Sequence, residues 1–235
     1  RFKAAPTLTK VTVTVTDPAN TKTTTRFHQD APKQGRVQRV TVTDAQDATY
    51  VDRQTTWLCS DPAAGVHFCR PQRQTVTVSD GDVTSKQTAT SYEYETTHGN
   101  LTKITEEGDT STTTDDRVTQ ITYAINSGAW IVNRPATSTI SAPSGSKRSE
   151  QRFYYDNGAL GAAPTLGRLT KAEQWLDQTN TYVGSTLTYD AYGNVTRIVD
   201  PLAHKVDLAY EATGKTHVAS ITNEALHVRG CSYHL

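Results

Sequence analysis

The sequence predicts an all-β protein, built as an antiparallel meander of tandem hairpins. Roughly 40 threonines with 11 tyrosines fit a pleated, half-buried surface and fill helices poorly. Several short runs alternate apolar and polar residues with period two, as a strand with one buried face does. Turn residues recur at about 8–12-residue intervals between these runs, which is typical of consecutive hairpins.

Length and charge restrict the classes of function. The 235 residues, with 24 Lys and Arg against 24 Asp and Glu, have zero formal net charge and suffice for one large or two small domains. A nucleic-acid-binding protein usually carries a basic surplus, so no nucleic-acid partner is expected. No apolar run approaches the roughly 20 residues that span a bilayer, so no membrane span is expected either. The chain begins at Arg1 and contains no Met, which suggests a piece of a longer polypeptide or a processed chain.

Alternation predicts three strands in the first half of the chain. Residues 11–16 alternate Val and Thr, residues 40–43 repeat the pattern, and residues 75–78 show it again. Asp80-Gly81 follows the third run, and Asp-Gly between alternating runs is a strong hairpin signal because Gly accepts a positive φ without steric cost. Each of these runs should therefore place valines on one face and hydroxyls on the other.

The second half of the chain continues the pattern. Residues 118–125 and 129–132 read as further strands, because β-branched and aromatic residues dominate them. Residues 168–177 fit a short helix or a strand, and Leu169 and Trp175 also satisfy strand parity.

A recurring unit of tyrosine, acidic residue and glycine determines the interpretation. It occurs four times, and Phe27 with Gly35 resembles a worn copy. The four copies are Tyr94, Glu95 and Gly99; Tyr155, Asp156 and Gly167; Tyr189, Asp190 and Gly193; and Tyr210, Glu211 and Gly214. Self-similarity of this kind is the signature of a repeat architecture.

Each part of the unit has a mechanical role in a hairpin. The tyrosine should close one strand and pack its ring on the sheet. The acidic residue should accept hydrogen bonds from backbone N–H groups of the turn, and the glycine should take the left-handed position that a short hairpin loop requires. Between the third and fourth copies, Asp200-Pro201 should form the opposite turn, with Pro at its favoured second position.

These residues resemble the RHS/YD-repeat family. Tyr189-Asp190-Ala-Tyr-Gly193-Asn-Val-Thr, then Asp200-Pro-Leu-Ala-His, then Tyr210-Glu211, is similar to the YD repeat. The likeness extends over residues 91–227. The proteins that this chain resembles include the B-type shell component of Tc toxin complexes and secreted RHS polymorphic toxins. Ala203 stands where the repeat usually has Gly, and Glu211 where it usually has Asp.

The resemblance implies a fold, a role and partners. Residues 91–235 would form an RHS/YD-repeat region and residues 1–90 a β-rich N-terminal flank with weak repeat character. The whole would be a segment of a spiralling β-shell: a structural, non-catalytic wall that encloses a toxin polypeptide and is continued by further repeats of a larger RHS polypeptide. A bacterial virulence protein that is secreted or exposed on the cell surface would fit this role.

A second reading is a secreted or surface β-module that binds glycans or a receptor. Trp57, Trp130 and Trp175 could form stacking platforms for sugars, or they could be hydrophobic plugs between successive hairpins. An enzyme is not expected, because the sequence contains no Gly-x-Ser-x-Gly elbow to seat a nucleophile. No cofactor is expected, because there is no phosphate-binding glycine loop and no Cys-x-x-Cys.

Acidic pairs and cysteines are the remaining candidates for chemistry. Asp115-Asp116, Glu106-Glu107 and the Asp80/Asp82 pair could hold calcium or transfer protons, but adjacent carboxylates in loops are more often solvated turn residues. Cys231, with the histidines at 227 and 234, offers too few ligand types for a structural zinc site, so no metal is expected. Cys59 and Cys69 flank a loop-like stretch, residues 60–65. They could form a disulfide or be two small buried residues near a turn.

Overall fold

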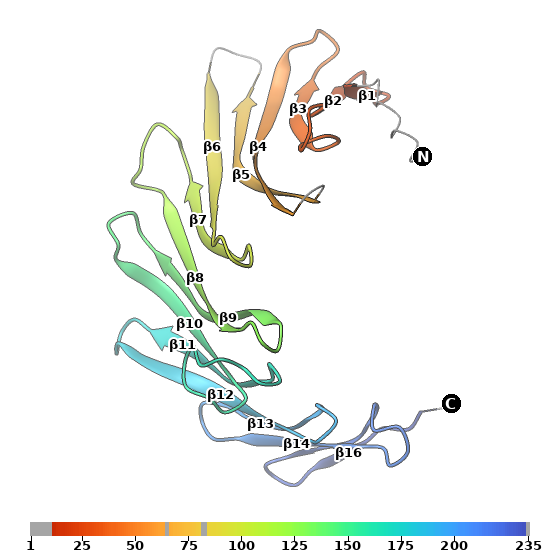
Figure 1. The fold of residues 1–235 in the computed structure, drawn as a ribbon, viewed down its shortest axis with the longest axis vertical. Coiled ribbons are helices and arrows are strands. Elements are labelled where there is room, and N and C mark those ends of the chain that lie inside the picture. The colour runs from red at the N-terminus through yellow and green to blue at the C-terminus, as the bar shows by residue number, and fades with distance from the viewer. Residues whose placement is uncertain (1–10, 64–65, 81–83, 234–235) are drawn as a thin grey trace. The chain divides into compact units, whose positions relative to one another are not determined.

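A computed structural model of the 235-residue chain describes residues 11–63, 66–80 and 84–233. It confirms the all-β prediction: the described residues form one antiparallel meander sheet in which sixteen strands follow one another in chain order, without a helix (Figure 1). The strands are β1 Thr12–Thr16, β2 Lys22–Phe27, β3 Val37–Thr43, β4 Thr49–Ala63, β5 Val66–Ser79, β6 Ser85–Tyr94, β7 Leu101–Glu107, β8 Arg117–Asn126, β9 Ile131–Ser141, β10 Lys147–Tyr155, β11 Leu169–Leu176, β12 Thr181–Tyr189, β13 Val195–Val199, β14 Lys205–Tyr210, β15 Val218–Asn223 and β16 Val228–Gly230.

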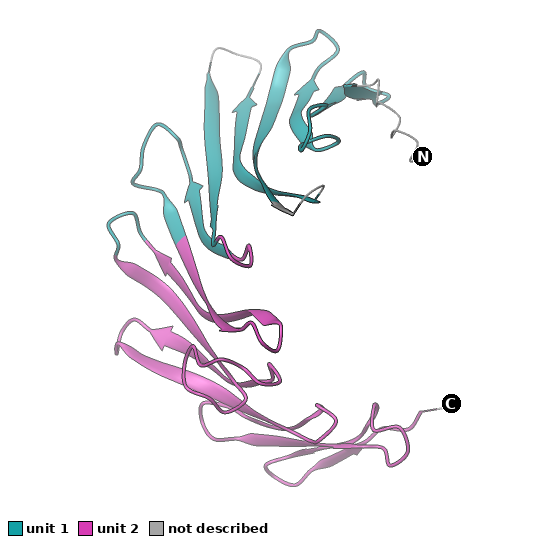
Figure 2. Ribbon diagram, in the orientation of Figure 1, with its two compact units in different colours: residues 1–95, 101–118, 142–145 teal, residues 96–100, 119–141, 146–235 magenta. Residues whose placement is uncertain are grey.

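The chain divides into two compact units (Figure 2). Unit 1 contains residues 1–95, 101–118 and 142–145, and unit 2 contains residues 96–100, 119–141 and 146–235. Unit 2 holds three of the four tyrosine–acid–glycine copies in full. The sequence-based boundary after residue 90 stays a prediction.

Strand parity sorts the side chains of unit 1 as the alternation predicts. In β1, Val13 and Val15 share one face, and Thr14 on the other face pairs its hydroxyl with that of Thr24 on β2 at 3.0 Å. The polar face continues across the sheet with Arg39, whose guanidinium contacts Asp52 at 2.8 and 3.0 Å. The hairpin signal at Asp80-Gly81 falls partly outside the described residues.

Unit 2 repeats this division into a charged and an apolar face. Residues 168–177, which fitted a helix or a strand, form strand β11. Lys171, Glu173 and Trp175 lie on its charged face, where Lys171 and Glu173 form an ion pair at 2.5 Å. The face changes with each residue along a strand, so the alternation of charged and small residues here favours the strand.

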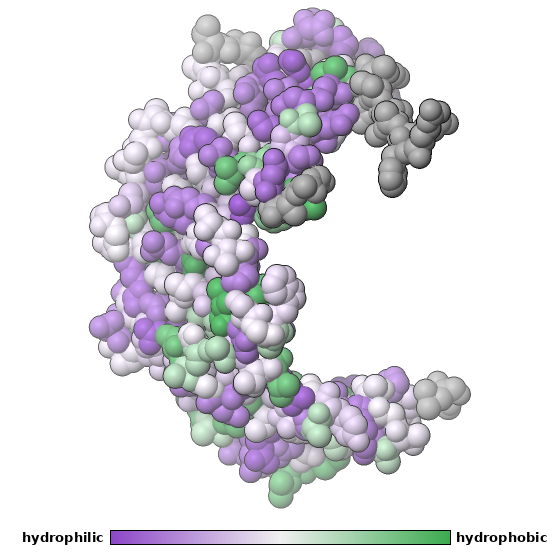
Figure 3. Space-filling model, viewed as in Figure 1, coloured by the Kyte–Doolittle hydropathy of each residue, from purple (hydrophilic) through white to green (hydrophobic). Residues whose placement is uncertain are grey.

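The core of this single-layer sheet is small. Its one cluster among the described residues joins Ala124, Ala136 and Tyr155, with Phe153 and Leu169 packed against it. Apolar residues are otherwise scattered over the surface, with green patches between purple ones in Figure 3. Since no second layer covers the described sheet, contacts along the sheet have to supply much of its stability.

A disulfide joins Cys59 on β4 to Cys69 on β5, with their Cα atoms 4.0 Å apart. The two cysteines are directly opposite in the strand pair. Of the loop-like stretch 60–65, residues 60–63 continue strand β4 and residues 64–65 lie outside the described part. The bridge therefore joins two paired strands within a long hairpin and does not lie at the base of a loop over residues 60–65.

Candidate functional site

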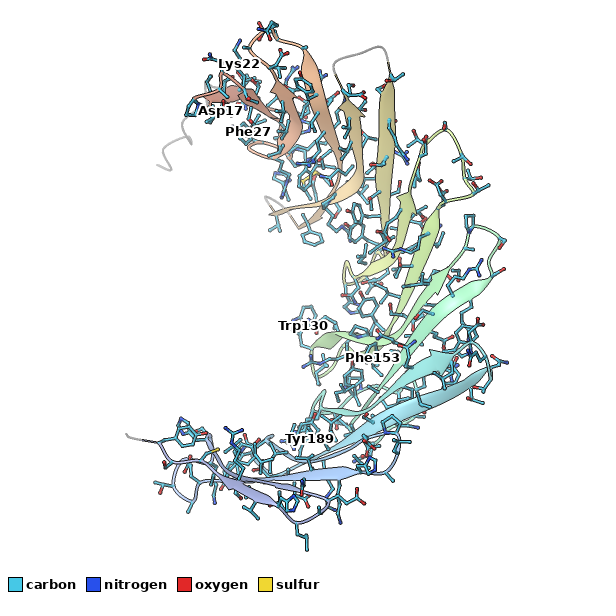
Figure 4. The ribbon with its side chains drawn as sticks, turned by 180° about the vertical axis from the view of Figure 1, so that it is seen from behind. Asp17, Lys22, Phe27, Trp130, Phe153 and Tyr189 are labelled. Atoms are coloured by element: carbon cyan, nitrogen blue, oxygen red, sulfur yellow. A yellow bond between two sulfur atoms is a disulfide. The ribbon has the colours of Figure 1, made fainter. Side chains whose placement is uncertain are left out.

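The candidate site is the row of strand ends and turns that carries the repeated tyrosines. We call this row one edge of the sheet, and the turns at the other ends of the strands the opposite edge. Tyr189 shows the geometry of the site best. This residue ends β12, and its hydroxyl donates a hydrogen bond of 2.7 Å to the backbone carbonyl of Leu169 on β11. Continuing the Lys171–Thr186 pairing by two residues places Leu169 opposite Thr188, the residue before Tyr189. The ring therefore lies back over the preceding strand (Figure 4).

The other three motif tyrosines make the same bond with the same offset. Each ends its strand, and each donates to the carbonyl of the residue that faces the position just before the tyrosine. The bonds are Tyr94 to Pro71 at 2.9 Å, Tyr155 to Pro135 at 2.9 Å, and Tyr210 to Val195 at 3.1 Å. A repeated sequence motif thus produces a repeated contact.

Two further residues repeat this contact outside the sequence motif. The indole Nε1 of Trp57 donates to the carbonyl of Val37 at 2.8 Å, and the hydroxyl of Tyr233 donates to that of Val218 at 3.2 Å. Both bonds have the same offset from the strand register. Sequence reasoning missed them, because Trp57 is not a tyrosine and neither residue precedes an acid. The available signal was only that both residues are aromatic hydrogen-bond donors.

A β-bulge accompanies each motif tyrosine on its other side. The register shifts at Tyr94, Tyr155, Tyr189 and Tyr210 in the pairing with the following strand, and it shifts at Phe27 and Trp57 as well. Bulges increase local twist and redirect side chains. Burial raises the pKa of the Tyr155 and Tyr189 hydroxyls, which therefore stay protonated and able to donate.

The acidic residue after the tyrosine binds the turn through backbone N–H groups. Asp156 accepts bonds of 2.7–2.9 Å from the N–H groups of residues 165–168. Burial opposes ionisation of this carboxyl, but the four N–H donors outweigh it and lower its pKa to about 2. The N–H groups of Thr216 and Gly214 likewise lower the pKa of Glu211 to about 2. Asp190 accepts from Tyr192 and Asn194, each at 2.9 Å.

The first copy divides between the compact units. Glu95 follows β6 and belongs to unit 1, whereas Gly99 belongs to unit 2. Gly99, Gly167 and Gly193 have positive φ values of 81°, 71° and 92°. In the last copy the left-handed residue is Lys215, with φ 57°, and not its neighbour Gly214. The longer Glu211 side chain bonds to the N–H groups of a turn that is shifted by one residue.

A second set of contacts runs forward to the next hairpin, and sequence reasoning missed it. In each, a side chain at one turn donates to a backbone carbonyl at the next turn of the same edge. These contacts are Asn100 to Val132 at 2.6 Å, Asn126 to Pro164 at 2.8 Å, Arg168 to Asp190 at 2.9 Å, and Asn194 to Lys215 at 2.6 Å. Three of the four donors directly follow a motif glycine, which was the available signal.

The turns at the opposite edge follow one plan of their own. Asp200 accepts from the N–H groups of Leu202 and His204 at 2.8 and 2.9 Å. Asp17 and Asp44 do the same two and four residues on. Ala203, which replaces the usual glycine, nevertheless takes the left-handed position with φ 69°.

The three tryptophans have different environments. Trp175 is buried, and the ammonium of Lys147 lies 4.2 Å from its ring centroid. Trp57 is half-buried beneath the guanidinium of Arg36. Trp130 alone of the three is exposed, at 76%. The chain's own cations therefore cover two of the three candidate sugar platforms.

Three of the candidate acids are engaged in ion pairs or turns, whereas one carboxylate oxygen of Asp116 is buried without a hydrogen-bond partner among the described residues. Glu106 binds Arg117 at 2.7 Å, Glu107 binds Arg73, and Asp115 accepts from the N–H of residue 109 at 2.8 Å. The Arg73 guanidinium keeps the pKa of Glu107 below its usual range. Asp82 lies outside the described residues, as does the histidine at 234. Within the described ranges, no three His, Cys, Asp or Glu side chains converge as metal ligands.

An open cleft lies on the charged face of unit 2. It has a volume of about 460 Å³, and Tyr154, Thr170 and Lys171 are among its lining residues. Tyr154 donates to Glu173 at 2.6 Å, and Lys171 pairs with the same carboxylate. Burial opposes ionisation of Glu173, but bonds from Lys171 and Tyr154 keep its pKa low. This carboxylate is therefore an acceptor that is already occupied, and it cannot donate a proton near neutral pH.

Comparisons with known proteins identify no family. No protein-family model matches the chain, and no curated protein matches it. Among solved structures, a porin-like protein from Bacteroides uniformis is 14% identical with a TM-score of 0.37, covering 94% of this chain and 88% of that one. The Photorhabdus luminescens Tc holotoxin pore (12% identity, TM-score 0.36) and a TcdB2-TccC3 structure (10%, 0.31) match over 94% and 90% of this chain. The chain spans 14% and 12% of those two chains.

Proposed function

We propose that this chain is a structural, non-catalytic wall segment of a hollow RHS-repeat β-shell that encloses a toxin polypeptide. The observation that supports this most is the constant offset of the tyrosine bond in successive hairpins. A contact with the same geometry in each unit lets hairpins be added in series, because each unit needs only its neighbours. A wall requires this property, whereas a catalytic centre requires a unique constellation.

The distribution of charge also supports a structural role. Three of the four motif acids, Asp156, Asp190 and Glu211, have lowered pKa values because their carboxylates accept hydrogen bonds from backbone N–H groups. General acid catalysis needs a carboxyl whose pKa is raised towards the working pH. The pKa values of these three acids are shifted in the opposite direction, which suits acids that stabilise turns.

The disulfide favours an oxidising compartment for this protein. Cys59 and Cys69 are bridged, and disulfides persist in oxidising environments such as the periplasm or the cell exterior. This supports a secreted or surface-exposed bacterial protein. The partners in this proposal are the further repeats that continue the sheet and the polypeptide that the shell encloses.

Limited proteolysis with mass spectrometry tests the proposal on the full polypeptide that carries this chain. A shell should protect a segment outside residues 1–235 from protease until urea unfolds the wall, and the segment should then be cut. Cleavage of all such segments at equal rates under native conditions would reject enclosure. The non-catalytic part fails if the purified chain catalyses a reaction that Glu173→Gln abolishes while the melting temperature is unchanged.

A further inference from the structure

Trp130 occupies a position that its own chemistry disfavours. It lies at the tip of the β8–β9 turn, exposes 76% of its surface and has a φ of 54° (Figure 4). A bulky residue in the left-handed region is an outlier, whereas Asn tolerates it. Asn180 takes the corresponding position of the β11–β12 turn, with φ 51° and the same bond to the residue three before it. The chain therefore keeps a strained backbone at Trp130 and leaves the indole largely in solvent, with the His98 ring in edge contact at 6.3 Å between centroids.

The next two turns of the same edge also present a large apolar side chain. Leu166 in the β10–β11 loop is 64% exposed, and Tyr192 in the β12–β13 turn is 72% exposed. We call Trp130, Leu166 and Tyr192 the tip row. Isolated exposed apolar residues are ordinary, but a row on adjacent tips indicates an interaction surface. Trp and Tyr are also the residue types that most often dominate binding energy at interfaces.

Hydrogen bonds hold neighbouring tips together. Asn126 of the first tip donates to the carbonyl of Pro164 in the second at 2.8 Å, and Arg168 of the second donates to the carbonyl of Ala191 in the third at 3.3 Å. Neighbouring tips are two strands apart, so their spacing is about 10 Å. A surface that is ordered before binding loses less entropy when a ligand arrives.

An exposed guanidinium lies beside the second tip of the row. Asp156 and Asp190 direct their carboxylates into their own turns, where backbone N–H groups bind them. Arg134 is exposed and lies against Gly167, where an added Cβ would approach its Nε to 2.9 Å. A ligand with acidic groups between its apolar contacts would complement this arrangement.

The spacing selects the form of the ligand. A polyproline II helix has three residues per turn and rises about 3.1 Å per residue, so every third side chain recurs at about 9 Å on one face. This repeat matches the roughly 10 Å spacing of the tips. Proline-rich segments in this conformation commonly dock on aromatic side chains. We propose that the tip row binds an extended polypeptide segment of the polyproline II type, with an apolar residue at every third position and acidic residues between.

Fluorescence anisotropy on the whole chain tests the proposal with a defined probe. The probe is a labelled peptide of four Leu-Pro-Glu repeats, and a peptide of the same composition without the three-residue period is its control. We expect saturable binding of the periodic peptide only. Trp130→Asn, which also relieves the left-handed backbone, should weaken binding by about tenfold or more, and Tyr192→Ser should weaken it in the same direction.

Leu226→Asn is the matched control variant. Leu226 is also 76% exposed and left-handed, with φ 62°, but it lies in the β15–β16 turn at the opposite edge. This variant should bind the periodic peptide as the unaltered chain does. The proposal is overturned by equal binding of both peptides, by no binding, or by an equal loss in Leu226→Asn. It is also overturned if Trp130→Asn instead removes binding on a glycan array or dissociates a dimer in light scattering.

Discussion

The hydroxyl of Tyr189 donates a 2.7 Å hydrogen bond to the carbonyl of Leu169, twenty residues earlier in the chain. The same bond, with the same offset from the register, recurs at Tyr94, Tyr155 and Tyr210. It ties the end of each hairpin's first strand to the strand before it. The tyrosine of the repeat is therefore a connection between neighbouring hairpins as well as an apolar contact on the sheet.

Tyr189→Phe should lower the free energy of unfolding by about 0.5–1.5 kcal/mol, because it removes a half-buried hydrogen bond but keeps the ring. Urea denaturation followed by circular dichroism measures the change. Tyr192→Phe is the control, since the Tyr192 side chain is exposed at 72% in the adjacent turn. An equal effect of both variants would show that the bond to Leu169 contributes nothing specific.

Phe27→Tyr should stabilise unit 1. Phe27 ends β2 and has the bulge of a motif tyrosine, but it lacks the hydroxyl. Each motif tyrosine donates to the carbonyl of the residue that faces the position just before it. Arg26 precedes Phe27 and faces Thr12, so the new hydroxyl should reach the carbonyl of Thr12. A gain of up to about 1 kcal/mol is expected in urea denaturation. Destabilisation of similar size would mean that the rule does not extend to this hairpin.

Asp156 should make stability depend on acid pH. Its pKa is about 2 in the folded chain and about 3.9 when unfolded, so the unfolded state binds the proton more readily. Its contribution is therefore complete above pH 4 and is lost as the pH falls from about 4 to 2. Asp156→Asn should unfold more readily than the parent at pH 6 and differ little from it near pH 2. Thermal melts across this range measure the difference, and a constant difference would contradict the assignment.

Reduction of the Cys59–Cys69 disulfide should destabilise unit 1. The cysteines are ten residues apart, and cross-linking a loop of this size removes unfolded-state entropy worth about 3 kcal/mol. A Cys59→Ser, Cys69→Ser double variant should lose a comparable amount in urea denaturation, and added reductant should have no further effect on it. Cys231→Ser is the control, because Cys231 is a free thiol. The assignment fails if the double variant is as stable as the parent.

Asn194→Ala should increase local opening of the β14–β15 turn more than that of the β12–β13 turn, in which Asn194 itself lies. The Asn194 amide donates to the carbonyl of Lys215 at 2.6 Å and to the carboxylate of Asp190 at 3.1 Å. Only the first bond crosses to the next hairpin. Hydrogen exchange should accelerate around residues 211–217, while the β8–β9 turn keeps its rate. Unchanged exchange in the β14–β15 turn would show that the forward bond does not hold the hairpins together.

Strand parity and turn chemistry made much of the fold predictable. The alternation in residues 11–16 predicts which side chains share a face, and β1 shows Val13 and Val15 together. The turn at Asp200 was predictable from Asp-Pro, because both residues have preferences that act within a few positions. These signals are local, so one sequence contains them.

The contacts between hairpins were harder to predict from the sequence. Asn194 and Lys215 are 21 residues apart, and no local preference links them. Trp57 shows a second reason: an indole N–H can replace a phenolic hydroxyl, so geometry is retained where residue identity is not. In the fourth copy, Glu211 is one methylene longer than Asp, and the left-handed position moves from Gly214 to Lys215.

The β10–β11 loop shows that the turns at this edge of the sheet can accept long insertions. Asp156 and Arg168 stay paired, with the Asp156 N–H bonded to the Arg168 carbonyl at 2.9 Å, although eleven residues intervene. Tyr155 below them keeps its bond to Pro135. Because the anchors sit at the base of the hairpin, insertions between them leave the strand ladder undisturbed. Evolution can therefore diversify the protruding loops independently of the scaffold that displays them.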